Sequence, residues 1–152
     1  MEEFKKTDKY QISSKNSNGE KIKSQAAMVV IDHKTGQVLG NVGGLGTEVN
    51  AAGFNRSTQA YRQPGSTIKP IAVIAPGLEN KVLTAGTVYA DVPTNFGTKA
   101  NPYEPKNDSN KFEGSMTIRE AIERSQNIPE VKAMSEIGPL NSINFLREIG
   151  VS

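Results

Sequence analysis

The pattern with the clearest chemical content in this sequence is a serine placed three residues before a lysine, Ser66 and Lys69. If the segment is helical, this spacing puts both side chains on one face, within hydrogen-bond reach of each other. A hydroxyl is a weak nucleophile near neutral pH, and a lysine can act as its base once burial or a neighbouring cation removes the lysine's proton. The pair is therefore suited to acyl transfer.

The residues around this pair predict a buried helix over 66–78. A Pro-Gly pair at 64–65 precedes it, an apolar run follows it, and Pro70, which lacks an N–H, fits best in the first turn. Ser66 and Lys69 would then lie at the amino end, where the helix dipole disfavours the ammonium and favours negative charge on an attacked carbonyl. The alternative is a serine cap followed by a solvated lysine. Against this alternative, Lys69 stands where the helix enters the core, and a lysine is rarely placed there without a reason because burying its charge is costly.

A second polar constellation, Ser125-Gln126-Asn127, stands at the junction between two predicted helices. Its ordinary interpretation is a polar turn from one helix to the next. Its functional interpretation is a hydroxyl that relays a proton and an amide that fixes a substrate carbonyl. The motif is short and common, so its weight comes from being paired with Ser66 in the same chain.

The residue types that are missing narrow the possible chemistry. The 152 residues contain no cysteine, which excludes thiolate nucleophiles, disulfides and most structural zinc sites. The only histidine is His33, so metal sites with several imidazoles are excluded, and a Ser-His-Asp triad is possible only if His33 is its histidine. The turn-rich residues around His33 favour an exposed polar side chain instead. The longest apolar stretches, 26–31 and 71–75, are far shorter than the roughly 20 residues that cross a bilayer.

Charge divides the chain into two parts. The sequence carries 18 basic and 16 acidic side chains, a net charge of +2 at pH 7. Residues 1–24 hold six lysines and four acids, a difference of +2, so residues 25–152 balance to zero. Residues 1–24 are polar without a clean apolar period, which is typical of a linker. The neutral remainder offers no clustered basic face, and a nucleic acid partner is not expected.

The apolar and turn residues predict a mixed α/β chain. We expect a β-hairpin with strands within 25–31 and 37–42, the first strand being apolar on both faces and therefore covered on both sides. Residues 80–115 should be irregular, with at most short strands. Three helices are expected after them: one behind the capping box Thr117-Ile118-Arg119-Glu120, one opened by Pro129 and closed by Gly138, and one between Pro139 and Gly150, striped by Leu140, Ile143 and Leu146.

Together these residues resemble the transpeptidase domain of penicillin-binding proteins, in particular the class A bifunctional enzymes. The likeness runs from about Gln25 to the end, and its two central motifs are RQPGSTIKP at 62–70 and Ser125-Gln126-Asn127. It implies an α/β (α+β) domain of the penicilloyl-serine transferase, β-lactamase-like fold, with helices packed on an antiparallel sheet. The supporting positions stand in the same order: Phe54-Asn55-Arg56, Thr87, Asp91 and Pro93, Tyr103-Glu104-Pro105-Lys106-Asn107, and Thr117-Ile118-Arg119-Glu120-Ala121.

The resemblance also implies roles for single residues. Ser66 would be the acylated nucleophile, with its N–H as one arm of the oxyanion hole, and Lys69 its general base. Ser125 would pass a proton to the leaving amine, and Asn127 would hold the substrate's amide. The implied substrate is the D-Ala-D-Ala end of a peptidoglycan stem peptide, cross-linked to an amine of a neighbouring strand, and β-lactam antibiotics would mimic that dipeptide. No metal or cofactor is implied.

The third motif of the family, Lys-Thr/Ser-Gly on a late strand, has no match after Asn127. Lys34-Thr35-Gly36 precedes the nucleophile and has an ordinary turn composition, so it is not this motif. We therefore expect residues 25–152 to be the N-terminal part of a transpeptidase domain, completed by a C-terminal partner segment. Residues 1–24 would be the linker from an absent glycosyltransferase domain.

The resemblance further implies a place and partners. The chain would work at the extracytoplasmic face of the bacterial cell membrane, with its anchor outside this sequence, on stem peptides and lipid-linked precursors. Three alternatives stay open at this point. The chain could be a β-lactam sensor, a D,D-carboxypeptidase or β-lactamase relative, or a fragment inactive without its Lys-Thr-Gly segment.

Overall fold

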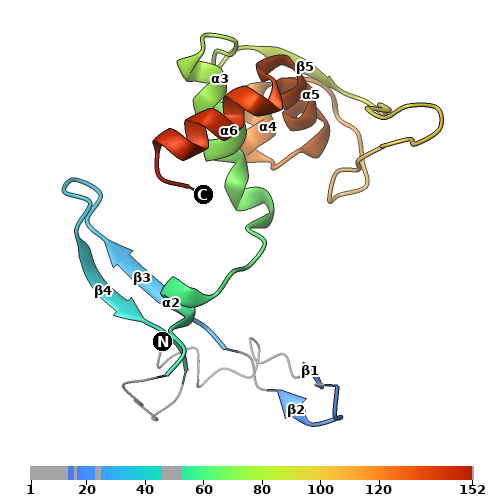
Figure 1. Ribbon diagram of the computed structural model, residues 1–152. Coiled ribbons are helices and arrows are strands. Elements are labelled where there is room, and N and C mark those ends of the chain that lie inside the picture. The colour runs from blue at the N-terminus through green and yellow to red at the C-terminus, as the bar shows by residue number, and fades with distance from the viewer. Residues whose placement is uncertain (1–13, 16, 23–24, 46–52, 152) are drawn as a thin grey trace. The chain divides into compact units, whose positions relative to one another are not determined.

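The structure is a computed structural model that describes residues 14–15, 17–22, 25–45 and 53–151 (Figure 1). The chain divides into two compact units, Met1–Gln63 and Pro64–Ser152. The sequence-predicted site residues all belong to the second unit. Within the described ranges, no helix combines the length and the apolar character that crossing a membrane requires.

The first unit holds two short antiparallel hairpins. β1 (Ser14–Lys15) pairs with β2 (Lys21–Ile22), and β3 (Met28–Ile31) pairs with β4 (Val38–Val42). The turn of the second hairpin is held by Asp32, whose carboxylate accepts hydrogen bonds from the N–H of Lys34 at 3.0 Å and the hydroxyl of Thr35 at 2.9 Å. The hairpin predicted from the sequence is thus confirmed.

The expectation that the first strand of this hairpin is covered on both sides is wrong. All four side chains of β3 are exposed, from 38% for Val29 to 56% for Ile31. Among the described residues β3 pairs with β4 alone, and the one helix described in this unit, α2 (Arg56–Gln59), has four residues. An apolar run predicts burial only where a second layer packs on the sheet, and a two-stranded ribbon has no such layer of its own.

The second unit begins with the helix predicted over 66–78, which runs from residue 65 to 79 and changes its pitch along the way. It starts as a 3-10 turn, η2 (Gly65–Ile68), continues as a π-helical turn, η3 (Pro70–Ile74), and ends as α3 (Ala75–Glu79). The extent of the helix is therefore confirmed, and its irregular geometry was not predicted.

Pro70 accounts for the 3-10 geometry of the first turn. In an α-helix residue 70 would donate its N–H to the carbonyl of Ser66, but proline has none. The N–H of Lys69 donates to this carbonyl instead, which makes an i to i+3 bond. Side chains three residues apart are eclipsed in a 3-10 turn, so this proline places Ser66 and Lys69 on one side of the helix.

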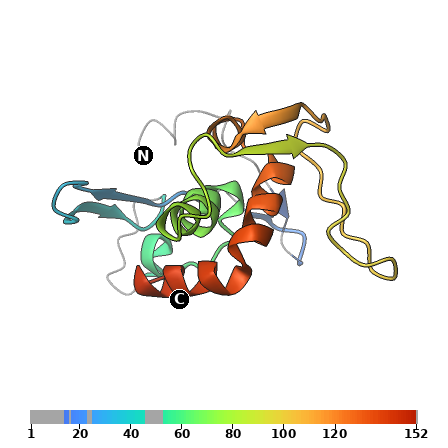
Figure 2. The same cartoon turned by 90° about the horizontal axis from the view of Figure 1, so that it is seen from above.

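A two-stranded sheet follows after the helix. β5 (Val88–Asp91) pairs antiparallel with β6 (Gly114–Thr117), and the two run side by side while the intervening loop extends away from the helices (Figure 2). Thr117 then caps α4 (Ile118–Glu123). Its hydroxyl accepts the N–H of Glu120 at 3.2 Å, and the Glu120 carboxylate accepts the N–H of Thr117 at 2.8 Å, so the capping box is confirmed.

The last two helices meet at one glycine. α5 (Asn127–Ile137) ends and α6 (Pro139–Glu148) begins at Gly138, whose φ of 83° lies in the left-handed region that favours glycine. Both helices were predicted. The apolar stripe predicted for α6 is not its buried side, because Leu140 and Ile143 are exposed.

The buried residue of α6 is a serine. The hydroxyl of Ser142 donates to the carbonyl of Ala72 at 2.5 Å. In an α-helical pattern that carbonyl would receive the N–H of residue 76, which is Pro76 and has none. The hydroxyl of Ser142 thus compensates for a missing helical donor and joins α6 to η3.

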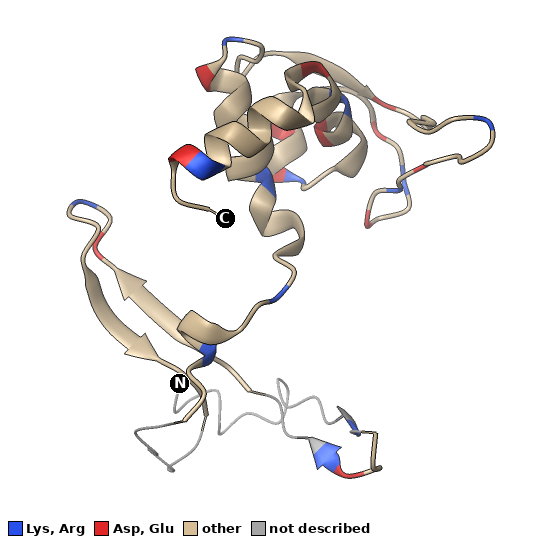
Figure 3. Cartoon of the chain, in the orientation of Figure 1, with Lys and Arg blue, Asp and Glu red and all other residues tan. Residues whose placement is uncertain are grey.

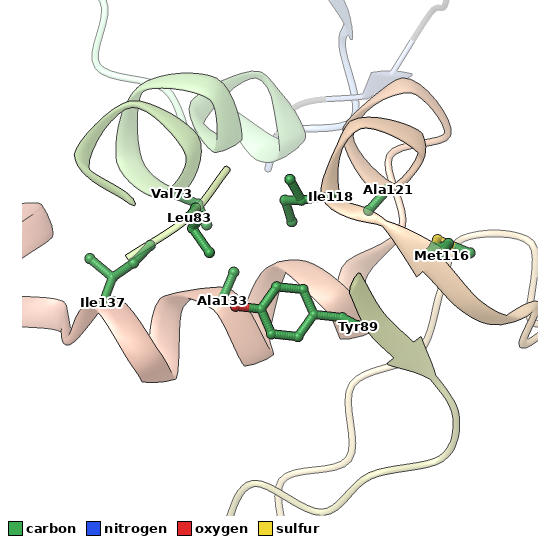
Figure 4. Packing of buried hydrophobic residues seen from close by; sticks show 8 residues of the cluster. All are labelled: Val73, Leu83, Tyr89, Met116, Ile118, Ala121, Ala133 and Ile137. Atoms are coloured by element: carbon green, nitrogen blue, oxygen red, sulfur yellow. The ribbon is translucent and has the colours of Figure 1, made fainter. Parts of the chain in front are cut away.

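The hydrophobic core of the second unit lies where the helices meet the β5–β6 sheet (Figure 4). α5 packs against β5, α3, α4 and α6, and so holds the centre of the unit. It contributes Ala133, whose small side chain lets neighbouring elements approach closely, and the large, fully buried Ile137. The core cluster consists of Val73, Leu83, Tyr89, Met116, Ile118, Ala121, Ala133 and Ile137.

Candidate active site

The side chain of Lys69 is the centre of the candidate site. It is 9% exposed, and its Nζ donates to the carbonyl oxygens of Ser125 at 2.9 Å and Gln126 at 3.1 Å and to Oδ1 of Asn127 at 2.8 Å. Its Nζ also lies 3.4 Å from the hydroxyl oxygen of Ser125. The structure therefore brings three of the four sequence-predicted site residues into direct contact, across more than 50 residues of chain.

Ser66 stands one turn before Lys69, at the exposed start of the helix. Its side chain lines the same pocket as Ser125 and Asn127. No hydrogen bond within the described part of the chain joins the hydroxyl of Ser66 to Lys69, whose donors all point to the 125–127 segment. In this state the lysine is positioned by the second motif, and the nucleophile candidate stands free at the pocket wall.

The second motif is shaped by a tight turn between α4 and α5. Ser125 has a φ of 55°, a left-handed conformation that non-glycine residues rarely adopt. Its N–H and that of Gln126 donate to carbonyls of α4, at 3.2 Å to Ile122 and 2.9 Å to Ala121. The turn directs the carbonyls of residues 125 and 126 toward Lys69, and it starts α5 at Asn127.

A buried asparagine from the loop after β5 supports this motif. Oδ1 of Asn107 accepts the N–H of Asn127 at 2.8 Å, and its Nδ2 donates to the fully buried carboxylate of Asp91 at 2.8 Å. Nδ2 of Asn127 donates to the carbonyl of Lys106 at 2.7 Å. In the sequence, Asp91, Lys106 and Asn107 stand out only as part of the family pattern, since the loop itself has no periodicity that indicates contacts.

The pocket beside these residues has a volume of about 580 Å³. One wall carries an ion pair between the guanidinium of Arg124 and the carboxylate of Glu113, both partly exposed. In the described part of the chain, no group of three or more His, Asp or Glu side chains could hold a metal ion. The pocket is lined by Ser66, Asp108, Ser109, Glu113, Arg124, Ser125, Gln126 and Asn127.

Burial sets the electrostatics of the site. It lowers the pKa of the Lys69 ammonium below its ordinary value, and the nearby carboxylate of Glu130 partly opposes that shift. Burial also raises the pKa of the Glu130 carboxyl to about 7, with Lys69 acting in the opposite direction. A lysine whose ammonium is destabilised in this way is closer to the neutral amine that a general base requires.

A serine and a buried lysine on one helical turn, beside a second serine and an asparagine in one pocket, define the kind of site that serves serine acyl transfer. Residues 26–152 match the family model described as "Penicillin binding protein transpeptidase domain". This match covers most of the chain, and the chain therefore belongs to the penicillin-binding protein transpeptidase family. The resemblance seen in the sequence is confirmed at this level.

Individual relatives agree with the family match. Penicillin-binding protein 1A of Clostridium tetani is 39% identical over 145 residues, which cover 93% of this chain and 18% of that protein. Penicillin-binding protein 1A of Neisseria gonorrhoeae is 36% identical over 129 residues, which cover 83% of this chain and 16% of that protein. The chain thus spans less than a fifth of the length of these relatives.

A solved structure supports the fold class. The crystal structure of penicillin-binding protein 1A from Haemophilus influenzae matches with a TM-score of 0.74 and 30% sequence identity, over 91% of this chain and 21% of that one. The predicted fold class, an incomplete penicilloyl-serine transferase fold with antiparallel strands and helices, is confirmed.

Proposed function

We propose that this chain supplies the nucleophile-bearing part of a serine D,D-transpeptidase that cross-links peptidoglycan stem peptides. The observation that carries the proposal is the buried Lys69, whose ammonium is held by residues 125–127. Ser66 lies one helical turn before Lys69 and lines the same pocket as these residues. Family membership supports the substrate class.

Acylation begins with a proton transfer. The neutral amine of Lys69 takes the proton of the Ser66 hydroxyl, and the oxygen attacks the carbonyl carbon of the penultimate D-Ala. The resulting oxyanion is stabilised by the N–H of Ser66 at the start of the helix. When this intermediate collapses, the C–N bond to the terminal D-Ala breaks and an ester with Ser66 remains.

The leaving amine needs a proton, and Ser125 is placed to pass it on. Its hydroxyl oxygen lies 3.4 Å from Nζ of Lys69, so a proton can move from the ammonium through this hydroxyl to the departing nitrogen. An amine of a neighbouring strand then attacks the ester carbonyl and gives a proton to Lys69. As the C–O bond to Ser66 breaks, Lys69 passes this proton to the Ser66 oxygen, which restores the hydroxyl and the neutral amine. Asn127 would hold the substrate's amide, exchanging its present hydrogen bond to the Lys106 carbonyl.

A C-terminal segment carrying Lys-Thr-Gly would complete the site, and residues 1–24 would link it to an upstream glycosyltransferase domain. The assembly would act at the extracytoplasmic face of the cell membrane on lipid-linked precursors and stem peptides. β-Lactams would acylate the same serine because they mimic the D-Ala-D-Ala end.

The test is acylation of the whole protein that contains this chain. A fluorescent penicillin should label the unaltered protein, and mass spectrometry should place the adduct on Ser66. Ser66→Ala should abolish labelling, while Ser109→Ala, which removes another hydroxyl from the same pocket wall, should leave it unchanged. Labelling that persists in Ser66→Ala, or an adduct on another residue, would contradict the proposal.

A further inference from the structure

One buried carboxylate has no role in the mechanism above. Glu130 lies in the first turn of α5, and its side chain is 2% exposed. Both of its carboxylate oxygens are fully buried, and neither has a hydrogen-bond partner within the described residues. A buried polar group in this condition is uncommon, since the lost contacts with water are normally replaced by protein donors.

Glu130 lies three residues after Asn127 on α5, and residues with this spacing share one face of a helix. Its carboxylate is therefore on the side of α5 where Oδ1 of Asn127 accepts from Nζ of Lys69 at 2.8 Å. Glu130 and Lys69 each alter the pKa of the other, and among the described residues no other charged group contributes to the shift at Glu130. The two side chains do not form an ion pair at contact distance, because the ammonium of Lys69 donates its hydrogen bonds to Ser125, Gln126 and Asn127. The interaction is therefore between charges that do not touch.

The other ionisable groups on the elements around Glu130 are engaged elsewhere or exposed. On β5, Asp91 accepts from Asn107 and from the N–H of Glu113, and Tyr89 donates to Glu136 of α5. Both signs are interspersed along the second unit (Figure 3). The remaining groups are Lys132, bonded to the Ala90 carbonyl; Glu120, bonded to Thr117; Arg124, paired with Glu113; and the exposed Glu79, Arg119, Glu123, Arg147 and Glu148.

The hydrogen bonds of Lys69 show which form of the lysine the site holds. Its three closest partners are carbonyl-type oxygens, which accept and cannot donate. An ammonium has three protons for three such acceptors, whereas a neutral amine would turn its lone pair toward one of them. The geometry thus favours the ammonium at rest, while catalysis needs the amine.

We propose that Glu130 is a positioning residue that sets the protonation state of Lys69 through its charge. As a carboxylate it holds the lysine as an ammonium, and as a carboxylic acid it lets the amine form. The inference rests on the proposed function for its consequence, since Lys69 is the base in that mechanism, but the coupling itself is a property of two buried side chains and can be measured without any reaction.

The first test uses the unaltered 152-residue chain, labelled with ¹³C at the ε-carbon of lysine and the δ-carbon of glutamate, in an NMR titration. The signal of Lys69 should show an inflection at the pH where Glu130 titrates, because the two sites are coupled. A Lys69 signal that passes through the Glu130 midpoint without an inflection would overturn the proposal.

Variants give the direction of the effect. Glu130→Gln should lower the titration midpoint of Lys69, since a favourable opposite charge is lost. Glu148→Gln, on exposed α6, should leave that midpoint unchanged. If Glu130→Gln does not fold, the reciprocal Lys69→Met should raise the Glu130 midpoint. A midpoint that stays in place in a folded variant contradicts the coupling.

A second readout separates this inference from the proposed function. In the whole protein that contains the chain, Glu130→Gln should extend fluorescent-penicillin labelling of Ser66 to lower pH, because more amine is present there. Coupled titration without any labelling would refute the proposed function and leave the coupling intact. Labelling with an unchanged pH profile in Glu130→Gln would refute the inference and leave the function intact.

Discussion

The side-chain oxygen of Asn107 accepts the backbone N–H of Asn127 at 2.8 Å, which links the loop after β5 directly to the second motif of the site. The other end of the same amide donates to the buried carboxylate of Asp91 and to the carbonyl of Lys111. One asparagine, 2% exposed, thus fixes the start of α5 and satisfies a buried charge in the neighbouring strand. Lys69 depends on it indirectly, because its acceptors lie in the segment that Asn107 holds.

Asn107→Ala should therefore lower the free energy of unfolding by about 3 kcal/mol, since it removes the side-chain donor of the buried Asp91 carboxylate and the acceptor of the Asn127 N–H. Urea denaturation of the folded chain measures this loss. Asn144→Ala, at an exposed position of α6, serves as the matched control and should change stability by less than about 0.5 kcal/mol. Equal stability of the two variants would show that the Asn107 network contributes nothing.

The stability of the chain should fall as pH rises from about 4.5 to about 7 because of Glu130. Its pKa is about 7 in the folded protein and 4.5 is its ordinary value, so in this window the folded state keeps a proton that the unfolded chain has released. Where the folded state binds more protons, the free energy of unfolding decreases with pH. Below the window both states are protonated, and above it both are ionised.

Substitution isolates this contribution. Glu130→Gln should flatten the dependence of the denaturation midpoint on pH between 4.5 and 7, whereas Glu148→Gln should keep the slope of the unaltered chain. Parallel curves for the unaltered chain and Glu130→Gln would mean that this carboxyl titrates normally in the folded state.

Local signals in the sequence were sufficient for most elements of the fold. The capping box at Thr117, the glycine at 138 and the turn after Ile31 each act through residues close in sequence, and each is found where it was predicted. Burial was less predictable. The apolar β3 is exposed, and Leu140 of α6 is 66% exposed, because burial depends on which layers pack together rather than on the apolar pattern of one segment.

The residues of the candidate site likewise fall into two groups, those that the sequence predicts and those that only the structure reveals. Ser66 and Lys69 are predicted from their spacing together with the flanking Pro-Gly pair and apolar run, and Ser125 and Asn127 from their pairing with Ser66 and the family resemblance. The supporting residues could not be found by such reasoning, since Asn107 lies in an irregular loop and Glu130 looks like an ordinary polar residue in the first turn of a helix. Only the packing of α5 against η3, which begins directly after Lys69, reveals that Glu130 and Lys69 share a buried environment.

Ser142→Ala tests whether the hydroxyl compensates for the missing N–H of Pro76. Without it the Ala72 carbonyl loses a donor in a buried place, and the free energy of unfolding should fall by about 1 to 2 kcal/mol. Ser115→Ala, exposed on β6, is the control for loss of a hydroxyl and should be close to neutral. An unchanged denaturation midpoint in Ser142→Ala would indicate that another donor already serves this carbonyl.

Gly77 lies in α3, against the hydrophobic core, at a position where an added methyl group should be poorly tolerated. A Cβ there would come within 2.7 Å of Cγ of Leu83 and 2.9 Å of Cδ1 of Ile137. Gly77→Ala should therefore destabilise the chain by about 1 to 3 kcal/mol despite the better helix propensity of alanine.

The matched control is Gly86→Ala, because the nearest atom to a Cβ at that position is the Thr84 hydroxyl oxygen at 4.0 Å. This variant should unfold at nearly the same urea concentration as the unaltered chain. If Gly77→Ala were as stable as Gly86→Ala, Leu83 and Ile137 would have room to move. The core between α3 and α5 would then be less tightly packed than the distances from Gly77 indicate.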